Sequence, residues 1–137
     1  MGYKHLFVDS DILLDLLLNR DPFHPQLLLL EATNREIRLS TSALVIANIN
    51  YILAKQVGAA NSRAKIKELI KTVKVLSFEA EVIDVALDSA FSDFEDSIQN
   101  IIAVRNNCDA IITRNIKDYK QATIPVLTAE QFLRTLS

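Results

Sequence analysis

The feature that most constrains the fold is the regular alternation of short apolar segments with longer amphipathic ones. Short runs typical of buried strands lie at residues 6–8, 37–40, 73–78, 110–113 and 124–127. Segments with helical periodicity separate each run from the next. Strands that alternate with helices predict parallel βαβ units with right-handed crossovers. We therefore expect an α/β fold with a central, mainly parallel sheet of four to five strands.

Capping residues predict where the helices begin. A polar side chain before an apolar helical run satisfies the first free backbone N–H groups, and proline fits the first helical turn. The last strand contains Pro125, which removes a ladder donor and places that strand at an edge of the sheet. The helix starts that we expect are Asp21 before Pro22, Thr41 or Ser42, Ser92 in a capping box with Glu95, and Thr128.

Length and composition restrict the class of protein. A chain of 137 residues, half of them hydrophobic, predicts one folded domain over residues 1–137. The net charge of −2 does not favour a general nucleic-acid binder, although a local basic patch and a metal ion would suffice for brief contact with RNA. The single cysteine, Cys108, excludes an intrachain disulfide and fits a cytoplasmic protein. The apolar runs are too short to span a membrane.

Acidic residues follow the predicted strands at the positions where ligands usually bind. Asp9 and Asp11 come directly after the first strand, Asp118 comes after the fourth, and Asp93 and Asp96 lie at the head of the helix between residues 92 and 106. In parallel sheets, functional side chains collect at the carboxyl ends of the strands. Clustered carboxylates repel one another unless a cation offsets their charge, and Mg²⁺ prefers oxygen ligands. The sequence therefore predicts a divalent-metal site at one edge of the sheet.

Several of these polar residues also have purely structural interpretations. Asp11 could cap the first helix, and Asp93 suits the helix dipole. Glu95 is best explained by the capping box with Ser92. Asp15, inside the first helix, is expected to be a solvated position. Near the fourth strand, Arg114 is a candidate contact for phosphate and Asn115 for a ligand or a water molecule.

Three segments resemble the motifs of PIN domains. Phe7 to Asp15 is similar to their opening Leu-Asp-Thr-Asn motif, which is followed by an apolar helix. Asp93 to Gln99 is similar to their Asp-Phe-Glu-Asp-Ala-Ile-Gln segment. Thr113 to Tyr119 is similar to their closing Thr-Arg-Asn-x-x-Asp-Phe motif. The three segments occur in the family's order and span nearly the whole chain, and VapC-type toxins of type II toxin–antitoxin pairs are the most similar group.

The resemblance implies a three-layer α/β/α fold and an endoribonuclease that depends on Mg²⁺ or Mn²⁺. It also implies RNA as substrate, a homodimer and an inhibitory antitoxin. By position, Asp9 corresponds to the first metal ligand, Asp96 with Asp93 beside it to the third acidic site, and Asp118 with Asn115 to the fourth. On this interpretation all four aspartates are catalytic, and Asp9, Asp96 and Asp118 bind the metal.

The chain departs from the family's pattern at its second acid. The long helix after the second strand commonly carries a glutamate there, and this chain offers Asn48 instead, which brings no charge. Asp11 stands where the family usually has asparagine and could restore a negative charge. Two other functions stay open: a PIN-like module that has lost catalysis and binds a protein partner, and a haloacid-dehalogenase-like phosphatase built on Asp9-x-Asp11.

Overall fold

The central sheet matches the sequence prediction. The computed structural model describes residues 2–136, and in it five parallel strands lie in the order β3-β2-β1-β4-β5. The two edge strands are β3 and β5, so the prediction of an edge position near Pro125 is confirmed. The strands are β1 (His5–Val8), β2 (Arg38–Ser42), β3 (Val73–Leu76), β4 (Ala110–Ile112) and β5 (Val126–Leu127).

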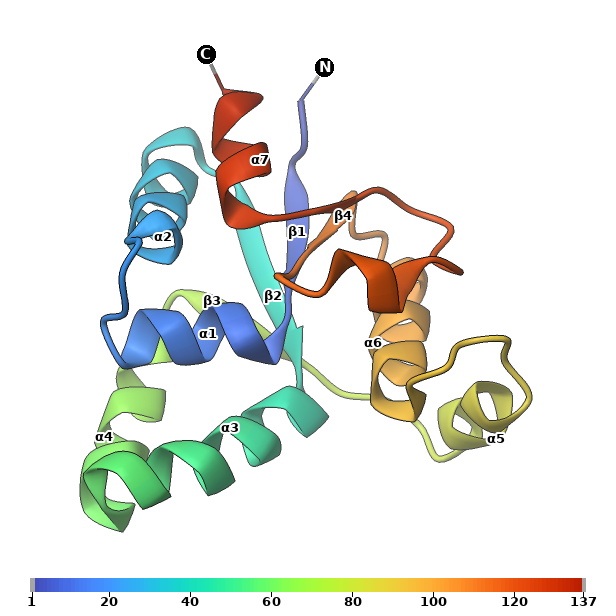
Figure 1. Cartoon of the computed structure of the whole chain (residues 1–137), viewed down its shortest axis with the longest axis horizontal. Helices are drawn as coiled ribbons and strands as arrows, with labels where there is room; N and C mark the ends of the chain where they lie inside the picture. Colours follow the sequence, from blue (N-terminus) through green and yellow to red (C-terminus); the bar gives the residue numbers. More distant parts are fainter. Residues whose placement is uncertain (1, 137) are drawn as a thin grey trace.

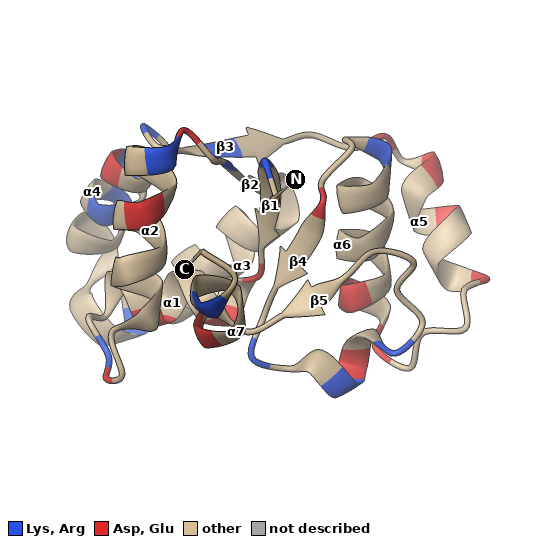
Figure 2. Ribbon diagram, turned by 90° about the horizontal axis from the view of Figure 1, so that it is seen from above, with Lys and Arg blue, Asp and Glu red and all other residues tan. Residues whose placement is uncertain are grey.

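Helices cover both faces of the sheet, which gives the three layers that the resemblance implies (Figure 1). Helices α1 to α4 lie on one face and α5 and α6 on the other, while α7 packs beside α2 (Figure 2). The helices are α1 (Ser10–Leu17), α2 (His24–Arg35), α3 (Ala43–Val57), α4 (Ala59–Leu69), α5 (Glu81–Leu87), α6 (Phe94–Arg105), the 3-10 helix η1 (Ile116–Tyr119) and α7 (Ala129–Arg134).

The middle strand β1 is the centre of the core. Leu6, Phe7 and Val8 are each no more than 1% exposed, and Ile111 and Ile112 on the neighbouring β4 are fully buried. A strand covered on both faces reads as a continuous apolar run, and this explains why β1 and β4 were recognisable from the sequence. The core thus fixes the backbone at the point where β1 ends and Asp9 begins.

Two predicted helix starts are wrong. Helix α2 begins at His24 rather than at Pro22, with Phe23 as its N-cap and Pro25 in its first turn, so the proline that suits a helix start is the later one. Helix α6 is capped by Asp93 rather than by Ser92, because the Asp93 carboxylate accepts a hydrogen bond from the Asp96 backbone N–H at 2.9 Å. The expected capping box of Ser92 with Glu95 therefore does not form.

Buried hydrogen bonds from β2 hold the two helical layers together. Ser42 caps α3, as predicted, by accepting from the Val45 N–H at 3.0 Å, and its hydroxyl donates to Gln99 Oε1 of α6 at 2.6 Å. The Thr41 hydroxyl donates to the Val8 carbonyl at 2.8 Å. These contacts tie the start of α3 and the middle of α6 to the end of β1. Within residues 2–136, no helix is long and apolar enough to cross a membrane.

Candidate active site

The acidic residues gather where β1 and β4 end. Asp9 follows β1 directly and is the N-cap of α1, with an extended backbone (φ −75°, ψ 164°). The amino end of α6 and η1 lie at the same end of the sheet (Figure 1). Because β1 and β4 pair in parallel, with Val8 opposite Ile112, residues that follow the two strands meet at one edge.

Asp9 is buried, and its carboxylate accepts three hydrogen bonds. Its Oδ1 accepts from the Ser10 N–H at 2.8 Å, while Oδ2 accepts from the Thr113 hydroxyl at 2.9 Å and from the Tyr119 hydroxyl at 3.1 Å. Burial raises the pKa of Asp9, and the three hydrogen bonds oppose that increase. The side chain is only 5% exposed, so its orientation is fixed by these donors rather than by solvent.

Asp11 lies beside Asp9 and has one oxygen without a partner. Its Oδ2 accepts from the Arg114 N–H at 3.0 Å and from the Thr113 hydroxyl at 3.3 Å. Its Oδ1 is buried and has no hydrogen-bond partner among the described residues. Burial, followed by repulsion from Asp9, raises the pKa of Asp11 to about 6. Asp11 therefore joins the cluster, and one of its acceptor oxygens is available to a ligand.

Asp96, Asp93 and Asp118 complete the acidic cluster. Burial raises the pKa of Asp96 to about 7, and the charges of Asp9, Asp93 and Asp118 add to this effect. Asp93 also acts on Asp9 by charge repulsion, in addition to capping α6. Acids from three separate parts of the chain thus influence one another electrostatically, which is the convergence that the sequence predicted. Which of them bind a metal stays a prediction.

The sequence analysis missed Tyr119. This residue ends η1, is 2% exposed, and places its hydroxyl between two of the acids: it donates to Asp9 Oδ2 and also forms a side-chain hydrogen bond with Asp96. Burial and the two carboxylates raise the pKa of Tyr119, so the phenol stays protonated. The only sequence signal was a tyrosine where the resembled closing motif has phenylalanine. The hydroxyl that this substitution adds is the group that reaches the acids.

Arg114 and Asp15 form an ion pair that the sequence analysis also missed. Arg114 Nε lies 2.9 Å from Asp15 Oδ2, and the Asp15 side chain is only 14% exposed, so the prediction that Asp15 is solvated is wrong. Half of the Arg114 side chain remains exposed at the rim of the site. Asn115 is exposed as well, and its N–H donates to the Thr113 hydroxyl at 3.1 Å, which helps to orient the hydroxyl that contacts Asp9.

Asn48 contacts Glu95 across the gap between α3 and α6. The Asn48 Nδ2 group donates to Glu95 Oε2 at 3.1 Å. Glu95 does not take part in the predicted capping box, because Asp93 caps α6 instead. The position where the family commonly has a glutamate therefore carries an amide that binds a glutamate from another helix. A carboxylate is present in this region, although it comes from α6 rather than from α3.

The donor chemistry of the cluster fits a hard divalent cation. In residues 2–136 no group of three His, Cys, Asp or Glu side chains is placed so that together they could hold a metal ion. Mg²⁺ does not need one, because it typically takes one or two carboxylates and keeps several waters. The raised pKa values of Asp9, Asp11 and Asp96 and the unpaired Asp11 oxygen show negative charge that a cation would stabilise. Figure 2 colours acidic residues red, and a red segment marks the acids of α6.

The fold and the site together define a class: an α/β domain with a parallel sheet whose acidic side chains gather beyond the middle strand. The sequence pattern of the PIN domain family matches residues 5–117. The chain therefore belongs to the PIN domain family, as the three motifs predicted.

Similar proteins agree with this assignment. Ribonuclease VapC1 of Aquifex aeolicus is 27% identical over 140 residues, which cover 96% of this chain and 95% of that protein. The structure of VapBC-1 from nontypeable Haemophilus influenzae superimposes with a TM-score of 0.67 at 18% identity, over 92% of this chain and 98% of that one. A toxin–antitoxin complex from Klebsiella pneumoniae gives a TM-score of 0.66 at 21% identity, over 90% and 97%. These structures support the fold of this chain.

Proposed function

We propose that this chain is a metal-dependent endoribonuclease and the toxin of a type II toxin–antitoxin pair. The observation that carries the proposal is the group of converging aspartates, in which Asp9 is buried, oriented by three donors and close enough to Asp96 to perturb its pKa. Membership of the PIN family and the full-length similarity to a protein named a ribonuclease support the same activity.

Asp9, Asp96 and Asp118 would hold the metal, one or two of them directly and the rest through water, with Asp11 as a further oxygen donor. When bound, Mg²⁺ or Mn²⁺ supplies a Lewis acid that activates water and stabilises charge on a phosphodiester. Thr113 and Tyr119 hold the Asp9 carboxylate in a fixed orientation. A preorganised carboxylate loses little freedom on binding a ligand, so these two hydroxyls contribute to affinity without touching the substrate.

RNA binding is assigned to the polar rim of the site. The Arg114 guanidinium is half exposed and anchored by Asp15, so it can contact a phosphate without losing its position. Asn115 lies next to it and is exposed. Asn48 with Glu95 lies on α3 and α6 and borders the cluster through the first turn of α6.

An inhibitory antitoxin is the partner we propose. The solved structures that resemble this chain include VapBC pairs from Haemophilus influenzae and Rickettsia felis.

The proposed cellular location is the cytoplasm, where RNA is accessible and where the free thiol of the buried Cys108 stays reduced. The family match leaves the phosphatase alternative without support.

The second candidate function is a protein-binding PIN domain without catalysis, and Asn48 is the observation that favours it. One assay separates the candidates. The purified chain is incubated with a mixed-sequence single-stranded RNA in Mg²⁺ or Mn²⁺, and the same reaction is repeated with excess EDTA. Cleavage that EDTA abolishes is expected; intact RNA in both reactions, together with tight binding of a co-expressed antitoxin, would favour the non-catalytic module.

A further inference from the structure

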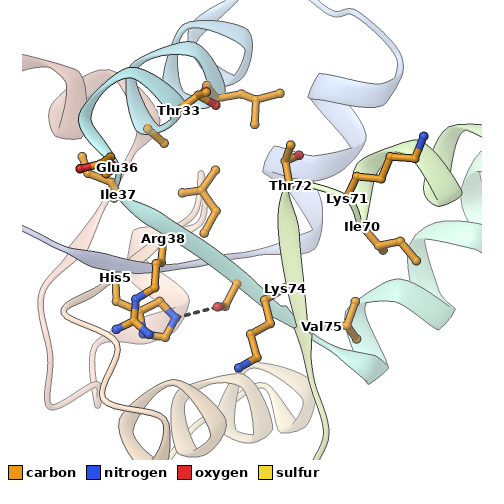
Figure 3. Close-up of a pocket in the computed structure, with 14 residues that line it drawn as sticks. His5, Thr33, Glu36, Ile37, Arg38, Ile70, Lys71, Thr72, Lys74 and Val75 are labelled. Carbon is orange, nitrogen blue, oxygen red and sulfur yellow. Dashed lines mark hydrogen bonds between the residues drawn. The ribbon is translucent and has the colours of Figure 1, made fainter.

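A second polar site lies at the opposite end of the sheet from the acids. A hollow of about 740 Å³ opens where β2 and β3 begin, beside the start of β1 (Figure 3). His5 and Asp9 stand at the two ends of β1, roughly 13 Å apart at ~3.3 Å per residue. The hollow is therefore distinct from the candidate active site. Its lining includes the charged residues Glu36, Arg38, Lys71 and Lys74, with His5 and Ser40 beside them.

Strand register places the key side chains on neighbouring strands. His5 of β1 is opposite Arg38 of β2, and Ser40 of β2 is opposite Lys74 of β3. Residues Arg38 and Ser40 lie two apart and so share one face of the sheet. In Figure 3 the His5 ring and the Arg38 guanidinium lie together on this face, and the Lys74 side chain extends beside them. Two cations and an imidazole thus converge on one small region.

The charge of the hollow is positive although the chain as a whole is acidic. Arg38, Lys71 and Lys74 outnumber Glu36, whereas the net charge of the chain is −2. Lys71 is paired with Glu68 at 3.0 Å, but neither Arg38 nor Lys74 has an ion-pair partner within residues 2–136. Asp109, which precedes β4, uses Oδ2 to accept hydrogen bonds from the N–H groups of Lys4 and His5. Two cations at the hollow are therefore available to an anion.

His5 supplies an independent indication of a ligand. The residue is 4% exposed, and its Nδ1 is buried without a hydrogen-bond partner among the described residues. Its Nε2 lies 2.6 Å from the Ser40 hydroxyl. If that hydroxyl donates to Nε2, the neutral ring carries its proton on Nδ1 and presents an unused donor. A buried donor without an acceptor is costly, so a bound anion would stabilise it.

Basic residues on an edge strand often serve to prevent aggregation, but this role does not explain all the cations at the hollow. A lysine on β3, such as Lys74, discourages edge-to-edge aggregation by placing charge beside the free strand edge. Arg38 and His5 lie on β2 and β1, which are both paired on each side, so they protect no edge. Protection of a strand edge also leaves the buried His5 Nδ1 without a hydrogen-bond partner within residues 2–136.

We propose that this hollow binds a phosphate group, held by Arg38 and Lys74 beside the His5 ring. Guanidinium and ammonium groups are the side chains that most often recognise phosphate. The proposal does not depend on nuclease activity, because no residue of the acidic cluster takes part.

Titration with inorganic phosphate tests the proposal directly. The full chain is kept in EDTA, so that the acidic cluster binds no divalent metal, and the ring nitrogens of both histidines are followed by NMR. Saturable binding is expected, with the His5 ring signals shifting and those of His24, which lies at the start of α2 and outside the hollow, unchanged. A His5 signal that does not move, or a response that never saturates, would overturn the proposal.

Variants with matched controls identify the groups involved. Arg38→Gln and Lys74→Gln should each weaken phosphate binding at least fivefold. Arg63→Gln and Lys67→Gln remove the same charges from exposed positions on α4 outside the hollow, so they should leave binding unchanged. Equal weakening by all four variants would show only general attraction of anions and would refute a specific site.

The source of the phosphate is resolved by two further ligands. Adenosine 5′-monophosphate should bind through Arg38 at least as tightly as phosphate does if the group comes from a mononucleotide. A short single-stranded RNA without terminal phosphates should bind instead if the group belongs to an RNA backbone. Arg38-dependent binding of either ligand supports the site and names its source, whereas Arg38-independent binding of both contradicts it.

Discussion

Among single residues, Asp9 and its orientation matter most for the proposed metal site. The sequence placed Asp9 at the end of a strand, and the structure adds the donors Ser10, Thr113 and Tyr119. Thr113 and Tyr119 follow β4, and their distance from Asp9 along the chain is more than a hundred residues. No local pattern could have predicted these contacts, because they depend on β4 pairing with β1. The sequence did predict that the site consists of carboxylates and that it lies at the carboxyl end of the strands.

Replacing Tyr119 by phenylalanine tests the contribution of its hydroxyl. Tyr119→Phe keeps the buried ring but removes the donor to Asp9 Oδ2, so the free energy of unfolding should fall by about 1 kcal/mol. Affinity for Mn²⁺ should fall several-fold because Asp9 is less well oriented. Urea unfolding and calorimetry measure the two effects. Tyr51→Phe, at a 66% exposed position on α3, is the control and should change neither. A Tyr119→Phe variant with unchanged metal affinity would contradict the positioning role.

The raised pKa of Asp96 predicts how stability depends on pH. Its folded-state pKa of about 7 is higher than the ordinary value of 3.8, so between these values the folded chain binds more protons than the unfolded chain. The free energy of unfolding in EDTA should therefore fall as pH rises from 4 to 7. Asp11, with a pKa of about 6, acts in the same direction. Asp96→Asn should flatten the profile measured by urea unfolding; a slope of opposite sign would contradict the burial of these acids.

At the scale of elements, the strands and their positions along the chain were predictable, while two of the four helix starts were not. Buried parallel strands carry a continuous apolar signal, and β1 and β4 were located within a residue or two. Caps are ambiguous because neighbouring polar residues compete for one role. Asp93 displaced Ser92 as the cap of α6, and Pro25 rather than Pro22 lies in the first turn of α2. The error at α6 also hid the contact of Glu95 with Asn48.

The Ser42 contacts are the main link between the two helical layers near the site. Ser42→Ala removes the cap of α3 and leaves the buried Gln99 Oε1 without its donor. The combined loss should be about 2–4 kcal/mol in the free energy of unfolding, because a lost cap costs about 1 kcal/mol and an unsatisfied buried acceptor about 1–3 kcal/mol. Thermal unfolding measures it. Thr128→Ala removes only the cap of α7 and should cost less. Equal losses in the two variants would show that the Gln99 contact is unimportant.

The contact of Asn48 with Glu95 predicts what a restored glutamate would do. In Asn48→Glu two carboxylates face each other between α3 and α6, so the melting temperature in EDTA should fall slightly. Mg²⁺ should then raise the melting temperature more than it does in the wild type, because the added charge lies near the acidic cluster. Asn48→Gln, which keeps the amide, is the control. An identical response to Mg²⁺ in wild type and Asn48→Glu would place Asn48 outside the reach of the metal.

At the scale of the whole molecule, the family and the fold followed from the order of the motifs, and both are confirmed. The net charge of −2 was evidence against a nucleic-acid binder, and the structure shows why it is a weak guide. Acids concentrate beyond β1 and β4, while unpaired cations lie at the opposite end of the sheet. The net charge does not reveal this separation. The separation depends on the fold, which places residues that follow the strands at one end of the sheet and residues that begin the strands at the other.

The predicted homodimer belongs to this scale as well. Exposed apolar side chains remain on three helices: Leu30 on α2, Tyr51 on α3 and Leu87 on α5 are each more than half exposed. A second copy of the chain or an antitoxin would cover such surface. Light scattering of the isolated chain should give twice the mass of one chain. A monomer at micromolar concentration would contradict the predicted homodimer.

The central claim, that the aspartates beyond β1 bind the catalytic metal, is tested most directly by calorimetric titration of Mn²⁺ into the wild type and Asp9→Asn. Cleavage of a single-stranded RNA is measured on the same samples, and circular dichroism checks that the variant is folded. We predict that the wild type binds Mn²⁺ and cleaves RNA, and that Asp9→Asn keeps its fold but loses both. A folded Asp9→Asn variant that binds Mn²⁺ and cleaves RNA as the wild type does would contradict the account.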